Sequence, residues 1–364
     1  MTVYLFAGGG TAGHVNPMLA TAEALSTKEP ASEIIVVGTS EGLESRLVPE
    51  RGFELVTVAK LPFPRSLSFS ALVFPFRFVI AALSLIRVIR RRGVSVVVGF
   101  GGYAAAPAYL AARIVGIPLV IHEANAIPGI ANKWASGFAS RVGIAFSGTP
   151  LPGSQLVGMP MSDAIAHLDR SAKRAEAYRL FDLDPALPVL FVTGGSTGAN
   201  RLNSTVSDSI DEILASGWQV LHTVGESRAF VDPKRTGYRV IRYCDRMDLA
   251  YAFADCVIAR SGAATVSELT GLGIPTIFVP YPVGNGEQFR NSEGVTAAGG
   301  AILCRDEEFT GAYVTGTVIP LLSNRETLRK MATAALGMGI RDGAERMVGL
   351  IASSRDGRVG KGKS

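Results

Sequence analysis

The stretch VYLFAGGGTAGHVNPMLATAEAL, residues 3–25, decides the fold of the first half of the chain. Its apolar run at 3–7 predicts a buried strand, the glycines predict a tight turn, and 17–25 has a helical pattern. A second stretch, VLFVTGGSTGANRLNSTVSDSIDEIL at 189–214, repeats the order of strand, glycine turn and helix. This repetition predicts two doubly wound α/β domains in tandem.

Further short apolar runs extend both halves. They lie at 34–37, 94–98 and 119–121, then at 219–224, 240–243, 256–259 and 276–279. Runs of β-branched residues without alternation indicate parallel strands that are covered on both faces. Three prolines within 147–160 place the linker there.

Composition agrees with two globular domains. The chain has 364 residues, of which 48% are hydrophobic and 18% charged, with a net charge of +5. That charge suits a phosphate-bearing ligand or an anionic membrane surface. The three cysteines form no C-x-x-C pair, which indicates reduced thiols in a cytosolic compartment. The N-terminus has no basic region or cleavage site typical of a signal peptide.

The first glycine turn, 8–14, could bring backbone N–H groups close to an anion. Dinucleotide enzymes use similar turns, but the acidic residue they place after the second strand is absent, because 34–37 is followed by Gly-Thr-Ser. His14 ends the turn and could act as a general base near neutral pH. The alternative is a loop histidine that makes only local hydrogen bonds.

A second candidate site follows the apolar run 256–259. Ser261 is a suitable N-cap for a helix that starts at about Ala263, whose N–H groups could bind a diphosphate beside Arg260. The Glu268 carboxylate would lean back toward the helix start and could bind the hydroxyls of a ribose. The alternative is a capped helix with a solvated glutamate.

Two further strand ends carry polar side chains. The segment 280–291 offers Glu287, Gln288 and Asn291 to a sugar, although an ordinary polar loop would read the same way. The segment His-Glu-Ala-Asn at 122–125 ends in Asn125, an amide that can both donate and accept.

Six segments together resemble the peptidoglycan (lipid II-forming) N-acetylglucosaminyltransferases, the MurG family of GT-B glycosyltransferases. In order they are GGGTAGH, FGGYAAAPA, HEANAIPGIANK, TGGSTGAN, RSGAATVSEL and PYPVGNGEQFRN. The resemblance implies two Rossmann-like parallel-sheet domains that face a cleft. It places an acceptor and membrane-associated domain at 1–158, a UDP-sugar domain at 159–338 and a helix that crosses back at 339–354. The Gly- and Lys/Arg-rich tail, 355–364, is predicted to be disordered.

The resemblance also implies the reaction. N-acetylglucosamine would pass from UDP-N-acetylglucosamine to the C4 hydroxyl of N-acetylmuramoyl-(pentapeptide)-diphospho-undecaprenol (lipid I), by an inverting displacement with His14 as base. Positions that match donor-sugar and acceptor contacts are Thr11, Ala12, Gly13 and Asn125. Positions that match nucleotide-sugar contacts are Ser196, Arg260, Ala263, Ala264, Thr265, Val266, Ser267, Glu268, Glu287 and Gln288.

The chain departs from the family pattern at three of its positions. Ala12 replaces a glycine, Ser162 stands where the family has an arginine, and Glu287 stands where some members have glutamine. Three other functions stay open: a GT-B transferase with a different UDP-sugar or a glycolipid acceptor, a UDP-N-acetylglucosamine epimerase, and a non-catalytic nucleotide-sugar-binding subunit.

No metal or cofactor is expected, and UDP-N-acetylglucosamine is a substrate. The one Asp-x-Asp, at 182–184, precedes its strand and so lies at the end opposite the glycine turn, and the four histidines lack zinc spacing. No nucleic-acid motif is present.

The most apolar stretch, 69–92, predicts a peripheral contact with the cytoplasmic face of the cell membrane. Pro75, Arg77 and Arg87 are expected to interrupt it, so that no transmembrane helix forms. Phe74, Phe76 and Phe78 would enter the interface, while Arg77, Arg87, Arg91 and Arg92 would meet anionic headgroups. The alternative is a core helix with a basic last turn. The resemblance adds cell-wall synthesis and division proteins as partners.

Overall fold

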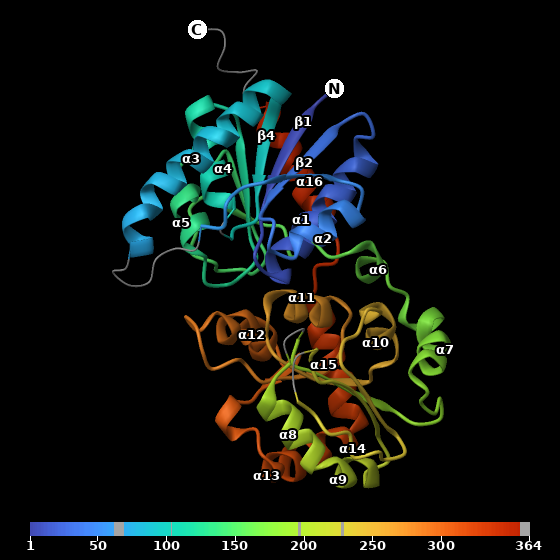
Figure 1. The fold of residues 1–364 in the computed structure, drawn as a ribbon. Coiled ribbons are helices and arrows are strands. Elements are labelled where there is room, and N and C mark those ends of the chain that lie inside the picture. Colours follow the sequence, from blue (N-terminus) through green and yellow to red (C-terminus); the bar gives the residue numbers. More distant parts are fainter. Residues whose placement is uncertain (62–68, 103, 196–197, 227–228, 357–364) are drawn as a thin grey trace. The chain divides into compact units, whose positions relative to one another are not determined.

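The computed structural model describes residues 1–61, 69–102, 104–195, 198–226 and 229–356, and of 69–71 and 356 only the backbone (Figure 1). The chain forms two compact units. Unit 1 comprises Met1–Ser162 with Asp342–Ser364, and unit 2 comprises Asp163–Arg341. Ser196 and the predicted tail beyond residue 356 lie outside the described residues.

Unit 1 is built on a seven-stranded parallel sheet of order β3-β2-β1-β4-β5-β6-β7. Val3 of the central strand β1 pairs with Glu33 of β2 and with Val94 of β4, which sets the register on both sides. The strands are β1 (Val3–Ala7), β2 (Glu33–Gly38), β3 (Glu54–Thr57), β4 (Val94–Gly99), β5 (Leu119–Glu123), β6 (Arg141–Ile144) and β7 (Ser154–Leu156).

Helices cover both faces of this sheet (Figure 1). Leu85 and Tyr109 pack on one face, and Met18 and Met347 pack on the other. Because both faces are covered, β1 is buried along its whole length, as its apolar sequence predicts. The helices are α1 (Ala12–Lys28), α2 (Glu44–Glu50), α3 (Phe69–Arg92), α4 (Ala105–Val115), α5 (Ile130–Ser136) and α16 (Gly343–Asp356).

Unit 2 repeats the plan with six parallel strands of order β10-β9-β8-β11-β12-β13. Its strands are β8 (Val189–Thr193), β9 (Gln219–Thr223), β10 (Tyr238–Ile241), β11 (Cys256–Ala259), β12 (Thr276–Phe278) and β13 (Ala301–Leu303). The helices are α6 (Asp163–Ala166), α7 (Arg170–Phe181), α8 (Asn200–Asp208), α9 (Ile210–Ala215), α10 (Met247–Phe253), α11 (Ala263–Gly271), α12 (Glu287–Ala297), α13 (Gly311–Tyr313), α14 (Ile319–Ser323) and α15 (Arg325–Met338), with short helical segments at Asp306–Glu308 and Val314–Val318.

The prediction of two Rossmann-like parallel sheets is confirmed, because both units share the doubly wound strand order. Three local expectations are wrong. Helix α1 begins at Ala12 rather than at 17, so that His14 lies in its first turn. The predicted helix 199–214 is two helices, α8 and α9, which meet at Ser209. The predicted linker contains β7, which pairs with β6 in the sheet of unit 1.

Helix α3 also differs from its prediction. It runs unbroken from Phe69 to Arg92 with Pro75 inside it, so this proline, which has no N–H to donate to the preceding turn, does not end the helix. By length and composition alone, Leu72–Arg92 is long and apolar enough to cross a membrane, so the expectation that no such stretch exists is wrong. Its last turns nevertheless belong to unit 1, where Leu85, Ile86 and Ile89 join the core.

Candidate active site

The switch point of the unit 1 sheet lies between β1 and β4, where two glycine turns pack backbone against backbone. The N–H of Phe100 donates to Ala7 O at 2.8 Å. Gly102 has φ +83°, and a Cβ there would lie 2.3 Å from Gly9 O. Only glycine fits such a contact, so the turns after β1 and β4 form one continuous surface.

His14 lies on this surface. Its Nδ1 is 3.2 Å from Thr11 Oγ1, and its Nε2 would be 3.4 Å from a Cβ on Gly101. The ring is partly buried, and this burial holds the pKa of His14 below its usual value, against smaller opposing effects of the Gly9 backbone and the Glu44 charge. The imidazole is therefore mostly neutral at neutral pH, as a general base must be. Ala12 and Gly13 precede it in the same turn of α1.

Glu44, at the start of α2, is buried beneath the first glycine turn. Its Oε1 accepts from Thr39 N at 2.8 Å and Thr39 Oγ1 at 2.7 Å, and its Oε2 accepts from Gly10 N at 3.2 Å. Burial works to raise the pKa of Glu44, and the hydrogen bonds outweigh it, so the pKa lies below its usual value. The sequence analysis missed this residue, because it considered only the positions directly after the second strand.

His122 is the second-last residue of β5 and lies in the core, out of contact with solvent. It is fully buried, its Nε2 lies 2.9 Å from Gly158 O, and its ring packs 5.5 Å from that of Phe100. Burial lowers the pKa of His122 to about 4. It supports the turn after β4 and leaves His14 as the candidate base.

The Asn125 turn is fastened by a buried network that sequence reasoning also missed. Glu123 accepts from Asn125 N at 2.9 Å and from Asn132 Nδ2 at 2.9 Å. Asn132 Oδ1 accepts from the Tyr109 hydroxyl at 2.8 Å, and that hydroxyl accepts from Gly101 N at 3.0 Å. Burial raises the pKa of Glu123 despite these donors. The network connects predicted residue Asn125 to the glycine against which His14 lies.

In unit 2, Arg260 follows β11 at the switch point beside β8. Its Nη1 donates to Val279 O at 2.9 Å and Pro280 O at 3.0 Å and pairs with Asp306 Oδ1 at 2.6 Å. The guanidinium lies 5.5 Å from the Tyr281 ring centre. Among the described residues, its buried Nε has no hydrogen-bond partner.

Helix α11 starts at Ala263 as predicted, but Ser261 does not cap it. Gly262 is the N-cap, and the buried Ser261 Oγ has no hydrogen-bond partner in the described part of the chain. The N–H groups of Ala263, Ala264 and Thr265 lack helical acceptors, since the helix ladder begins with Val266 N to Gly262 O at 2.9 Å. N–H groups without a helical acceptor therefore gather here, as an anion site requires.

The later residues of α11 divide between core and surface. Val266 is buried, and its N–H is already bonded to Gly262 O. Ser267 is partly exposed. Glu268 Oε2 accepts from the Tyr251 hydroxyl at 2.9 Å, and burial raises the pKa of Glu268 to about 7.

Helix α12 brings the third predicted segment to the same place. Gln288 Oε1 accepts from Tyr281 N at 2.9 Å, and Asn291 Nδ2 donates to Ser261 O at 3.3 Å. Glu287 N donates to Asn285 Oδ1 at 3.2 Å at the helix start. Hydrogen bonds thus join the turns that follow β11 and β12. Tyr281 and Asp306, which contact Arg260, were not predicted as site residues from the sequence.

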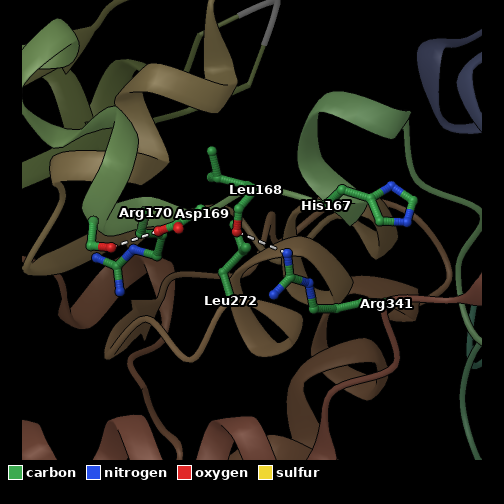
Figure 2. A pocket seen from close by; sticks show the side chains of 7 residues that line it. His167, Leu168, Asp169, Arg170, Leu272 and Arg341 are labelled. Atoms are coloured by element: carbon green, nitrogen blue, oxygen red, sulfur yellow. Dashed lines mark hydrogen bonds between the residues drawn. The ribbon is translucent and has the colours of Figure 1, made fainter.

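Two of the cavities in the structure differ in how close they lie to the predicted residues. One, of about 460 Å³, lies at the start of α7 and is lined by His167, Leu168, Asp169, Arg170, Ser171, Leu272 and Arg341, none of them predicted (Figure 2). Its Arg341 donates to the carbonyls of Ala166 and Leu168 at 2.8 and 2.9 Å, and its Arg170 to those of Tyr251 and Ala254, so these cations already serve the fold. The other, of about 550 Å³, is lined by Gly10 and Thr11 beside the His14 turn.

Comparison with known proteins places this geometry in a family. Residues 4–144 match the glycosyltransferase family 28 N-terminal domain, and 189–347 match its C-terminal domain. A UDP-N-acetylglucosamine–N-acetylmuramyl-(pentapeptide) pyrophosphoryl-undecaprenol N-acetylglucosamine transferase from Clavibacter sepedonicus is 55% identical, over 96% of each chain.

Solved structures agree. Acinetobacter baumannii MurG is 27% identical with a TM-score of 0.79, over 97% of this chain and 100% of that one. A Neisseria meningitidis UDP-GlcNAc 2-epimerase bound to UDP-GlcNAc has a TM-score of 0.70 over 97% of this chain and 100% of its own, but is 14% identical, which shows a shared fold alone.

Proposed function

Since the chain belongs to glycosyltransferase family 28, we propose that it transfers N-acetylglucosamine from UDP-N-acetylglucosamine to lipid I. The acceptor is the C4 hydroxyl of N-acetylmuramoyl-(pentapeptide)-diphospho-undecaprenol, and the products are lipid II and UDP. The observation that carries this proposal is the 55% identity to a transferase of that name along almost the whole chain. The geometry of the two switch points supports it.

Unit 2 would hold the donor. The N–H groups at the start of α11 that have no helical acceptor, the Ser261 hydroxyl and the Arg260 guanidinium together suit the diphosphate. Glu268, one to two turns further along the helix, would accept from the ribose hydroxyls. Gln288 would hydrogen-bond the sugar through the amide N–H groups that its contact with Tyr281 leaves available.

Unit 1 would supply the base. His14 Nε2 accepts the proton of the C4 hydroxyl, and the oxygen attacks the anomeric carbon of N-acetylglucosamine. The bond from that carbon to the diphosphate oxygen breaks, its electron pair leaves with UDP, and the configuration inverts. An oxocarbenium-like transition state is expected by analogy with glycoside hydrolysis. Asn125 would help to orient the sugars.

The proposed chemistry uses no metal ion. The charge that develops on the leaving diphosphate would be met by helix N–H groups and Arg260. Among the described residues, no three His, Cys, Asp or Glu side chains are grouped so as to hold a metal ion. A chelator should therefore leave the rate unchanged, and a strict requirement for an added divalent ion would contradict this part of the proposal.

The deciding measurement is UDP release from UDP-N-acetylglucosamine, with and without a lipid I analogue in detergent. We expect release that depends on the acceptor and falls at least about a hundred-fold in His14→Ala. Epimerisation of the free sugar nucleotide without any acceptor would instead support the epimerase. Transfer only to a different glycolipid would move the assignment to another GT-B transferase.

We further propose that α3 holds the enzyme on the cytoplasmic face of the membrane. Phe76 is 74% exposed and Ile80 66% exposed, while the rings of Phe74 and Phe78 pack 5.9 Å apart beside them. Arg77 is exposed next to these apolar groups and donates to Lys60 O. Such a mixture suits the boundary between headgroups and acyl chains.

The basic end of α3 contributes less than its sequence indicates. Arg92 is bonded to both Glu33 and Glu54, the latter at 2.8 Å, so it is committed to unit 1 rather than to headgroups. Sedimentation with vesicles should fall several-fold in a Phe76→Ser/Ile80→Ser double variant, and Arg92→Gln should have little effect. Equal binding of the double variant would rule out α3 as the contact. Cell-wall synthesis and division proteins are further proposed partners.

A further inference from the structure

Glu44 does not contact the substrates in the proposed reaction. Its carboxylate is nevertheless bonded to Gly10 in the turn that leads to His14. We propose that Glu44 is a positioning residue: its carboxylate occupies the anion-binding place of the first glycine turn and so fixes the turn that presents His14. The inference rests on the proposed function, since it assigns a partner to the proposed base.

The argument begins with the match between donors and acceptors. Three donors converge on two carboxylate oxygens, namely Thr39 N and Oγ1 on Oε1 and Gly10 N on Oε2. One side chain thereby joins the end of β2 to the turn after β1. Hydrogen bonds to a buried charge are stronger than those between neutral groups.

Space around the carboxylate is reserved by glycines. A Cβ on Gly9 would lie 2.6 Å from Glu44 Oε1, one on Gly42 would lie 2.2 Å from Oε2, and one on Gly38 would lie 2.3 Å from Cγ. In a dinucleotide-binding turn, comparable glycines give room to a pyrophosphate. Here the Glu44 carboxylate occupies the space that a pyrophosphate would fill, so we infer that the Gly10 N–H does not bind a diphosphate.

The charge also acts on His14. Burial lowers the pKa of His14, and the negative charge of Glu44 works in the opposite direction. Glu44 therefore has two effects on the base, one geometric and one electrostatic. A substitution that disturbed the fold without removing a charge near His14 would lack this electrostatic effect on the pH at which the base is protonated.

Glu44→Gln separates these effects. Its amide oxygen can still accept both Thr39 donors, which leaves the NH₂ group facing Gly10 N–H, donor against donor. We expect kcat for transfer to fall about a hundred-fold, as displacement by about 1 Å can cause, with donor KM changed less than about two-fold. The acidic limb of the pH profile should move to lower pH, because the imidazole loses a neighbouring negative charge.

Glu50→Gln is the matched control, since Glu50 ends the same helix α2, is exposed, and pairs with Arg46 at 3.4 Å. Its kcat and pH profile should match those of the wild type. Thr39→Val removes one donor and should produce a smaller loss of kcat in the same direction. If Glu44→Gln fails to fold, the Thr39→Val variant tests the proposal in its place.

The outcomes are distinct. A fall in kcat with a shifted acidic limb in Glu44→Gln supports the proposal. A kcat within about two-fold of the wild type, or a loss equal at every pH and matched by weaker UDP binding, overturns it. A wild-type enzyme that transfers nothing to lipid I would contradict the proposed function instead, before any variant is compared.

Discussion

Glu44 of unit 1 and Glu268 of unit 2 both lie close to the proposed sites of their units, and the two differ in how their charge is balanced. Glu44 of unit 1 is fully buried and receives three hydrogen bonds from the backbone and side chain of neighbouring turns, so its pKa is lowered. Glu268 of unit 2 is partly exposed and accepts from Tyr251, and burial raises its pKa to about 7.

The difference separates a carboxylate that completes the fold from a carboxyl group for which we propose a ligand. The donors around Glu44 are satisfied within unit 1, so its charge is already stabilised before any substrate arrives. Glu268 accepts one hydrogen bond, from Tyr251. At the start of the same helix, Ser261 Oγ and Arg260 Nε lack hydrogen-bond partners among the described residues. A ribose and a diphosphate would supply what is missing in unit 2.

The largest expected effect is on stability. Glu44→Ala leaves three donors unsatisfied in the core of unit 1 and should lower its free energy of unfolding by about 3 kcal/mol, whereas Glu268→Ala should cost unit 2 about 1 kcal/mol or less. The chain has two tryptophans, Trp134 in unit 1 and Trp218 in unit 2. Single-tryptophan variants would therefore report the urea unfolding of each unit separately. A larger cost at Glu268 would reverse the comparison.

Donor binding should show the next largest effect. Glu268→Gln keeps an oxygen that can accept from Tyr251, so the fold of unit 2 should be unchanged. The loss of charge-assisted hydrogen bonds to the ribose should weaken UDP binding about thirty-fold, corresponding to about 2 kcal/mol. Isothermal titration with UDP measures this directly, and Glu44→Gln is the control, for which UDP affinity should not change. Unaltered affinity in Glu268→Gln would remove it from the donor site.

Much of the fold could be predicted because its signals are local. Buried runs such as 3–7 and 256–259 are apolar throughout, and a parallel strand covered on both faces needs no alternation. Strand β3 has exposed residues at both ends and β7 has three residues, so neither shows such a run. Their pairing depends on a neighbour already in place, which a single sequence does not reveal.

The candidate site was predicted where a motif directly follows a strand, as at His14 and Arg260. Glu44 and Tyr109 were missed because each also bonds to a residue far away along the chain, Gly10 at 34 residues and Asn132 at 23. Ser261 was assigned the wrong role, because Gly262 adopts the extended N-cap conformation instead. The one available signal for Glu44 was the set of glycines around it, Gly9, Gly38 and Gly42, whose crowding appears only in three dimensions.

The pH dependence of donor binding would sharpen the comparison further. Ribose hydroxyls would donate to ionised Glu268, so bound donor should lower the pKa of Glu268 from its free value of about 7. Affinity should therefore rise with pH until that free value is passed, by about tenfold between about pH 6 and about pH 8. The Glu268→Gln variant should give a flat profile over this range. A wild-type profile equally flat would mean that Glu268 keeps one protonation state.

The smallest effect concerns the hydroxyl that holds Glu268. Tyr251 is 1% exposed, and its hydroxyl donates to Glu268 Oε2 at 2.9 Å. Tyr251→Phe keeps the ring and removes that donor, so the pKa of Glu268 should rise further and its carboxylate should be less well oriented. UDP affinity near neutral pH should fall about threefold, with the midpoint of its pH profile moved to higher pH. A threefold loss without that movement would assign Tyr251 to orientation alone, and a stronger affinity would show that the hydroxyl competes with the ribose for the same carboxylate.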